Sequence, residues 1–245
     1  MAKKRPIKIQ GDIHRPAGYM VEQSLGGMGT GPTPYEANMA DLLVDYTSKA
    51  EGYKDQATQW RYLILSEGYR EFQYLDTAKI PQATIGLGIN INEHRQHMNK
   101  TKTNPLDALE TAAPLMQDSR DMVHAEFGDK IFDLHPDARA AIYNLHYSVG
   151  HNKFMGFVNF VKAIRTNDAE GMAREYIDST LSGHKKELIG GDLFKAAGIN
   201  INPADLDHKN KAESQAWLKA NPRQTPIPVD SAEAYRKRKF SWDMR

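Results

Sequence analysis

Apolar side chains recur at helical spacing over two long stretches of the 245-residue chain. From Tyr35 to Leu65 they fall mostly three or four residues apart, which predicts one or two amphipathic helices. The same spacing returns from Leu106 onward, where glycines and prolines interrupt it and indicate helix ends. The helices predicted in this second stretch are 106–127, 136–149, 154–167, 168–182, 185–197 and 212–220.

A different pattern lies between these two helical stretches. From Thr84 to Ile91, Gly86 and Gly88 alternate with isoleucine and leucine, which predicts a short strand. Pro81, just before it, indicates a hairpin turn. With helices on both sides, these residues predict an α+β fold, mainly helical, with a small β-hairpin or sheet element.

The two ends of the chain do not share this core-forming pattern. Four glycines and two prolines fall within 26–34, a composition that neither a helix nor a central strand accommodates. Three prolines fall within 222–228, close to the other end. We therefore divide the chain into an extended N-terminal arm (1–40), a central domain (41–200) and a C-terminal extension (201–245) with a basic, aromatic tail.

Composition and charge exclude several classes of protein. Hydrophobic residues make up 40% of the chain, enough for a packed core, and the absence of cysteine excludes disulfides, thiolate metal sites and a cysteine nucleophile. No apolar run approaches the ~18 residues that span a bilayer, and the basic start lacks the apolar region of a signal peptide. We therefore expect a soluble protein without membrane association. The central domain carries 18 Lys and Arg against 22 Asp and Glu, a balance that does not favour nucleic-acid binding.

Candidate catalytic groups are concentrated in residues 66–90. Glu67 is predicted to end a helix at Gly68, and Asp76 follows at the edge of the β-element. Two carboxyl groups that face one cleft suit acid–base chemistry, because one can stay protonated while the other is ionised. Thr84 adds a hydroxyl that can hold a water molecule. The spacing alone also fits ordinary solvated surface charges.

The whole segment resembles the phage-type lysozymes, the endolysin-like muramidases. Their signature is Glu, eight residues, Asp, five residues and Thr, with a Glu-Gly-x-Arg start and a Thr-Ile-Gly-x-Gly strand. In this chain 67–70 reads Glu-Gly-Tyr-Arg, eight residues separate Glu67 from Asp76, and 84–88 reads Thr-Ile-Gly-Leu-Gly. The resemblance continues in 137–150 and 157–164, which look like the family's central buried helix and the helix after it. It covers about 41–200.

The resemblance implies a mechanism and a set of site residues. Glu67 would be the general acid that protonates the leaving oxygen of the MurNAc–GlcNAc β-1,4 bond, and Asp76, with Thr84, would position the attacking water. Asn144 and Ser148, four residues apart on one helix, are predicted to bind substrate. A buried Asn144 that fastens the β-element to its helix is an equal alternative. No cofactor and no metal are implied.

The segment departs from the family pattern at three points. Seven residues, not five, separate Asp76 from Thr84, so the predicted hairpin is longer. Ile89 stands where many members carry a histidine close to the catalytic Glu. Members also carry a basic residue late in the domain near that Glu, for which Lys185 or Lys186 is the nearest candidate.

Two further groups of residues carry weaker signals. His94 with His97, and His146 with His151, lack the third ligand of a zinc site, so solvated or capping histidines are the better interpretation. Residues 236–239 read Arg-Lys-Arg-Lys, with Tyr235, Phe240 and Trp242 around them. This tail is suited to an acidic partner protein, and nucleic acid is the less favoured partner because four charges are few.

Three functions are compatible with these features. The first, which we favour, is a peptidoglycan hydrolase carried in a phage virion, with both arms anchored to tail or internal proteins through Tyr235, Phe240 and Trp242. The second is a free endolysin that resides in the host cytoplasm until lysis. The third is a structural virion protein that keeps the lysozyme fold without activity. Poorly core-forming arms and an acidic central domain favour the first over the second.

Overall fold

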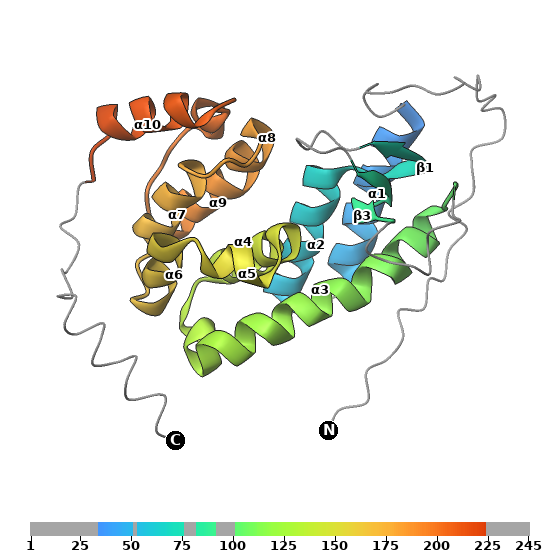
Figure 1. The fold of residues 1–245 in the computed structure, drawn as a ribbon, viewed down its shortest axis with the longest axis horizontal. Helices are drawn as coiled ribbons and strands as arrows, with labels where there is room; N and C mark the ends of the chain where they lie inside the picture. Colours follow the sequence, from blue (N-terminus) through green and yellow to red (C-terminus); the bar gives the residue numbers. More distant parts are fainter. Residues whose placement is uncertain (1–33, 51–52, 76–81, 92–100, 224–245) are drawn as a thin grey trace.

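The computed structural model describes residues 34–50, 53–75, 82–91 and 101–223 (Figure 1). This part of the chain is mostly helical and contains a three-stranded antiparallel sheet, so the prediction of a mainly helical α+β fold is confirmed. Asp76, His94, His97, residues 1–33 of the N-terminal arm and residues 224–245 of the C-terminal extension, which hold the three aromatic anchors, lie outside the described residues. No described helix is both long enough and apolar enough to cross a membrane.

The N-terminal half contains the sheet and three helices. In chain order its elements are α1 (Pro34–Ala50), α2 (Lys54–Glu67), β1 (Arg70–Leu75), β2 (Ala83–Gly86), β3 (Ile89–Asn90) and α3 (Pro105–Phe127). Asn104 caps α3, because its side chain accepts a hydrogen bond from the Asp107 N–H at 2.9 Å. The division at residue 40 cuts across α1, whose Tyr35 and Met39 are buried, so the folded unit already begins at Pro34.

The C-terminal half consists of shorter helices. They are η2 (Gly128–Asp133), α4 (Pro136–Val149), α5 (His151–Met155), α6 (Val158–Arg165), α7 (Ala169–Ile177), α8 (Gly183–Lys185), the π-helical turn η3 (Lys186–Gly190), α9 (Gly191–Ala196), η4 (Pro203–Leu206) and α10 (Lys211–Ala220). The predicted helix 136–149 is confirmed at both ends. The predicted helix 154–167 is wrong: the chain breaks at Gly156 and forms α5 and α6 instead. The predicted helix 185–197 is interrupted by the π turn.

The sheet has the order β1-β2-β3, and both strand pairs are antiparallel. Thr84 on the middle strand lies opposite Tyr74 on β1 and Asn90 on β3. The single strand predicted from Thr84 to Ile91 is therefore a hairpin with its turn at Leu87 and Gly88. The physical reason is that Gly86 and Gly88 adopt positive φ angles of 66° and 75°, which a continuous strand cannot contain.

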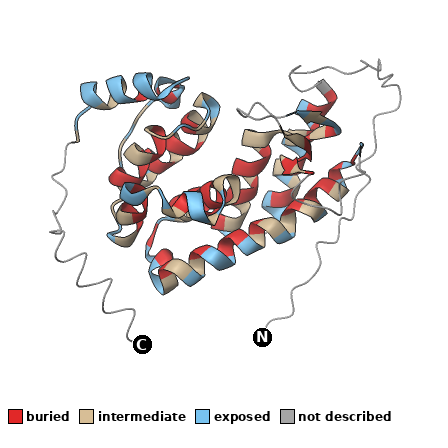
Figure 2. Cartoon of the chain, viewed as in Figure 1, coloured by how far each residue is buried: buried red, intermediate tan, exposed pale blue. Residues whose placement is uncertain are grey.

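Two hydrophobic cores hold the fold together. The N-terminal core packs α1, α2, the sheet and the first part of α3 around Tyr35, Met39, Leu43, Trp60, Leu63, Ile64, Tyr69, Ile85, Leu87, Ile89, Ile91, Ala108, Leu109, Ala112 and Met116. The C-terminal core packs α4 to α7, η3 and α9 with Tyr62 of α2 and the end of α3; its other large side chains are Phe127, Tyr143, Phe154, Phe160, Tyr176 and Phe194. Figure 1 shows α1, α2 and the strands on one side, α6 to α10 on the other, and α4 between them. Buried residues face the inside of both groups, whereas α10 is mostly exposed (Figure 2).

Helix α3 contributes to both cores and is tied to other helices between them. Met116 belongs to the N-terminal core and Val123 to the C-terminal core. Between these two residues, the buried Ser119 donates a hydrogen bond to the Tyr143 carbonyl of α4 at 2.8 Å. The buried Arg120 donates to the Gln59 side chain of α2 at 2.9 Å. Polar contacts thus fix the segment of α3 that joins the two cores.

Candidate active site

Glu67 is the last residue of α2, as predicted. Trp60, Leu63 and Ile64 bury the preceding turns of this helix in the N-terminal core. Gly68 ends the helix with a φ of 71°, and its N–H donates to the Ile64 carbonyl at 2.9 Å. The position of Glu67 is therefore set by the packing of α2, while its own side chain remains 24% exposed.

Lys185 brings a positive charge from the C-terminal half to Glu67. Its Nζ lies 2.6 Å from Glu67 Oε1, and its side chain is 14% exposed. The same ammonium lies 3.4 Å from Ser148 Oγ on α4. Three elements, α2, α4 and α8, therefore meet at one carboxylate between the two cores.

The structure distinguishes the two lysines that the sequence left as equal candidates. Lys185 faces Glu67, whereas the neighbouring Lys186 is fully buried and its Nζ lies 2.8 Å from Ser214 Oγ on α10. Burial lowers the pKa of Lys186. Lys186 therefore holds α10 against the domain, and Lys185 is the basic partner of Glu67.

Ser148 is adjacent to Glu67, and Asn144 lies one turn earlier on the same helix. Asn144 is only 1% exposed, and neither its amide nitrogen nor its oxygen has a hydrogen-bond partner within the described residues. The alternative in which Asn144 fastens the β-element by a hydrogen bond has no such bond to support it in this part of the chain. A buried, unpaired amide costs about 1–3 kcal/mol, so its presence calls for an explanation beyond stability.

Thr84 is placed on the middle strand, and Asp76 is not described. Thr84 is 4% exposed, and its hydroxyl donates to the Gln82 carbonyl at 3.1 Å, which leaves its oxygen lone pairs as acceptors. Asp76 lies outside the described residues, beyond Leu75 at the end of β1. The separation of the Glu67 and Asp76 carboxyl groups stays a prediction.

Two tyrosines near Glu67 were not predicted from the sequence. Burial raises the pKa of Tyr147, and the negative charge of Glu67 raises it further. The same two causes, in the same order, raise the pKa of Tyr176, whose hydroxyl is buried without a partner among the described residues. Both phenols stay neutral around Glu67. Tyr147 directly precedes Ser148, so the motif containing Ser148 was the available signal.

Two other residues of the 66–90 segment lie on strands. Arg70 lies on β1, with its guanidinium 3.9 Å from the Glu36 carboxylate of α1. Ile89, at the position of the family's histidine, is 2% exposed in the N-terminal core and lies opposite Ile85. A buried isoleucine that packs in the core therefore stands where the family carries an imidazole.

The expectation of solvated histidines is wrong for His146, which is buried, whereas His151 is partly exposed. Ser119 uses its proton on the Tyr143 carbonyl, so it accepts from Nδ1 of the buried His146 at 3.0 Å. Nε2 of His146 is then left to accept from Nδ1 of His151, 3.3 Å away. Burial, and to a lesser extent His151, lowers the pKa of His146. The described residues contain no group of three or more His, Asp or Glu side chains placed to hold a metal ion.

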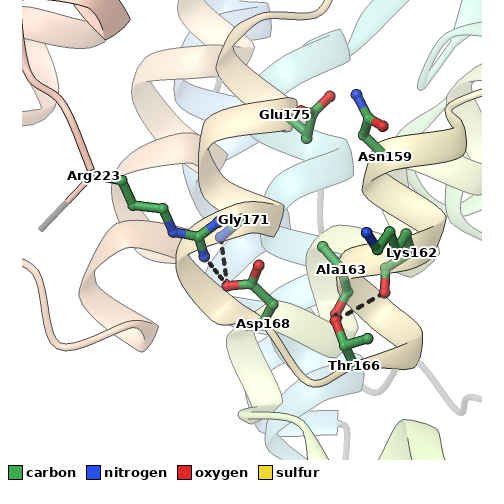
Figure 3. Close-up of a pocket in the computed structure, with 8 residues that line it drawn as sticks. All are labelled: Asn159, Lys162, Ala163, Thr166, Asp168, Gly171, Glu175 and Arg223. Atoms are coloured by element: carbon green, nitrogen blue, oxygen red, sulfur yellow. Dashed lines mark hydrogen bonds and ion pairs between the residues drawn. The ribbon is translucent and has the colours of Figure 1, made fainter. Parts of the chain in front are cut away.

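A separate pocket lies between α6, α7 and the segment after α10 (Figure 3). It is lined by Asn159, Lys162, Ala163, Thr166, Asp168, Gly171, Glu175 and Arg223. Arg223 donates to Asp168, the N-cap residue of α7, and its guanidinium also lies 3.7 Å from Glu170. None of the predicted catalytic residues lines this pocket. Its ion pairs hold the segment after α10 against α7.

Comparisons with known proteins add no family assignment. No model of a known protein family matches the chain, and no curated protein matches its sequence.

Proposed function

We propose that this protein is a peptidoglycan hydrolase, a muramidase that cleaves the MurNAc–GlcNAc β-1,4 bond. One observation carries the proposal: Glu67, the predicted acid, lies at a helix end between the two cores with Lys185 2.6 Å from its carboxylate. Ser148, predicted as a substrate contact, lies 3.4 Å from the same ammonium. Residues far apart in the sequence thus meet around the carboxyl group to which the resemblance assigns the chemistry.

In the proposed reaction, Glu67 donates its proton to the glycosidic oxygen as the bond to the sugar breaks. Asp76, assisted by the Thr84 hydroxyl, activates a water molecule on the opposite face of the ring. This is the inverting mechanism, which requires the two carboxyl groups to be roughly 6.5–9.5 Å apart so that the water fits between them. Ser148 and Asn144 would contact the glycan from α4. No cofactor or metal ion enters the scheme.

Replacement of Glu67 by Gln tests the proposal. The substitution keeps the size of the side chain but removes the proton donor, and general acid catalysis contributes roughly 10²–10⁴-fold. We expect a loss of that size in the clearance of purified peptidoglycan suspensions. Glu110→Gln, an exposed residue of α3, is the matched control and should keep the wild-type rate. A Glu67→Gln variant as active as the control would refute the assignment.

We propose further that the enzyme is carried in a phage virion and acts on the host wall during genome entry. The support is compositional: 1–33 and 224–245 hold glycine- and proline-rich or basic segments next to an acidic central domain. Detection of the full-length protein by mass spectrometry of purified particles would separate this proposal from a free endolysin. A folded wild-type protein that is present in particles but inert on peptidoglycan would favour the structural alternative.

A further inference from the structure

The turn between β2 and β3 lies directly against the Glu67 side chain. A Cβ atom added to Gly88 would lie 2.9 Å from Glu67 Cγ, 3.0 Å from Oε2 and 3.1 Å from Cδ. Real Cβ atoms do not approach other heavy atoms this closely, because dispersion gives way to steep repulsion. The space in which Glu67 rests therefore exists only because residue 88 has no side chain.

The two carboxylate oxygens of Glu67 have different neighbours. Oε1 lies 2.6 Å from Lys185 Nζ, so this oxygen is occupied as a hydrogen-bond acceptor. Oε2 faces the backbone of the turn at Gly88. A carboxyl group can donate only from the oxygen that carries its proton, and an ammonium group has no acceptor to share it. Oε2 is thus the oxygen suited to hold the transferable proton.

We propose that Gly88 is a positioning residue for Glu67, which keeps Oε2 directed toward the substrate while Lys185 holds Oε1. This inference rests on the proposed function and extends it to a residue outside the acid–base set. A side chain at position 88 would rotate the carboxyl group away from this orientation. Displacement of a catalytic group by about 1 Å costs roughly 10²-fold in rate.

Two separate features make glycine necessary at this position, and they can be tested apart. The first is the positive φ of 75°, which strains any other residue regardless of its surroundings. The second is the contact with Glu67. Gly198 offers a matched control, because its φ is 76° and a Cβ added there would meet nothing within 4 Å. Gly198→Ala therefore places an alanine at the same positive φ without the contact.

The experiment compares Gly88→Ala with Gly198→Ala. We expect similar folds, peptidoglycan clearance within about twofold of wild type for Gly198→Ala, and a fall of roughly 10²-fold for Gly88→Ala. The pH–rate profile of Gly88→Ala should also change on the limb that reports the acid, which a general loss of stability would not produce. Equal activity of the two variants, with unchanged pH profiles, would overturn the inference.

A second measurement tests the contact without any activity. In the wild-type background, Gly88→Ala should lower the urea midpoint of unfolding more than Gly198→Ala does. In a Glu67→Ala background, which lacks the colliding atoms, Gly88→Ala should lower the midpoint by less than it does in the wild-type background, whereas the effect of Gly198→Ala should be the same in both. An undiminished effect of Gly88→Ala in the Glu67→Ala background would show that Gly88 does not act through Glu67. If the wild-type protein is inert on peptidoglycan, the proposed function fails, yet this cycle still decides whether Gly88 and Glu67 are coupled.

Discussion

Two charged clusters in this protein are built differently. At the start of α7, Arg223 donates to Asp168, Arg174 donates to Glu170 at 2.7 Å and Asp168 also accepts from the Gly171 N–H at 3.0 Å. Around Glu67, one ammonium faces one carboxylate and lies 3.4 Å from the Ser148 hydroxyl, and the carboxylate raises the pKa of two phenols, those of Tyr147 and Tyr176.

The difference separates two roles for charge. The α7 cluster lies within the C-terminal half and joins residues on the same side of the molecule, so its bonds act to hold the chain. The Glu67 cluster joins residues 118 positions apart, from opposite sides of the molecule. Among the described residues, both regions hold a buried polar atom without a hydrogen-bond partner: Nε of Arg223 at α7 and the Tyr176 hydroxyl close to Glu67. The difference therefore lies in which segments each cluster joins, and not in how completely its polar atoms are paired.

The largest expected effects come from removing one cation from each cluster, Lys185 or Arg223, and comparing activity and stability. Lys185→Ala should lower peptidoglycan clearance by about 10²-fold, because Glu67 loses the group that orients it. Its effect on unfolding should be smaller than that of Arg223→Ala, because Lys185 pairs with one carboxylate and Arg223 with two. Arg223→Ala should do the reverse, with activity retained and the free energy of unfolding lowered by about 1–2 kcal/mol. Urea unfolding and clearance assays on both variants check this, and an active Lys185→Ala variant would contradict it.

A smaller effect is expected from the unpaired amide of Asn144. Asn144→Ala removes a buried amide whose lack of hydrogen bonds costs about 1–3 kcal/mol, and alanine is also the better helix former. The free energy of unfolding should therefore rise by about 1 kcal/mol. Activity should fall at the same time, since the amide is predicted to contact the glycan. Ser119→Ala is the control, because its buried hydroxyl makes two hydrogen bonds and its loss should destabilise by about 1 kcal/mol. A destabilised Asn144→Ala variant would show that the amide is bonded in solution.

The smallest expected effect is a pH dependence of stability, and it comes from histidines outside both clusters. Burial is the main cause that lowers the pKa of His124, His146 and His208 from the ordinary value of 6.5. Below this value the unfolded chain binds protons that the folded chain does not, so stability is complete above about pH 6.5 and declines as pH falls. Each histidine contributes a slope of at most about 1.4 kcal/mol per pH unit. Urea midpoints measured from about pH 7.5 to about pH 5.5 should fall, and should fall less steeply for His146→Gln; a flat profile for wild type would contradict the assignment.

Sequence reasoning located features that depend on local chemistry. Pro136 and Gly150 bracket α4, and Gly68 ends α2 at Glu67, because proline and glycine impose local backbone geometry wherever they occur. Alternation of glycine with isoleucine misled the reasoning at residues 84–91, since the pattern is the same for a strand and for a glycine-containing hairpin. Only the positive φ angles of Gly86 and Gly88 distinguish the two.

Features that depend on the meeting of distant segments were beyond the sequence. Lys185 and Lys186 are adjacent and chemically identical, yet one reaches Glu67 and the other Ser214. Their directions are set by α8 and the π turn that follows it, which no local pattern indicated. The contact between Gly88 and Glu67 likewise arises from packing of the hairpin on the end of α2.

The polar ties on α3 have a consequence for ligand entry. Ser119 anchors this helix to the α4 backbone and Arg120 anchors it to α2, at the point where the N-terminal core gives way to the C-terminal core. Hinge motion between the two halves would have to break the buried Ser119 hydrogen bond, which joins α3 to α4, whereas the Arg120 bond holds α3 to α2 within the N-terminal half. Because breaking the Ser119 bond is costly, Glu67 and Lys185 remain in register. For the glycan proposed as substrate, a preorganised pair of this kind requires little reorganisation on binding, so more of the contact energy appears as affinity.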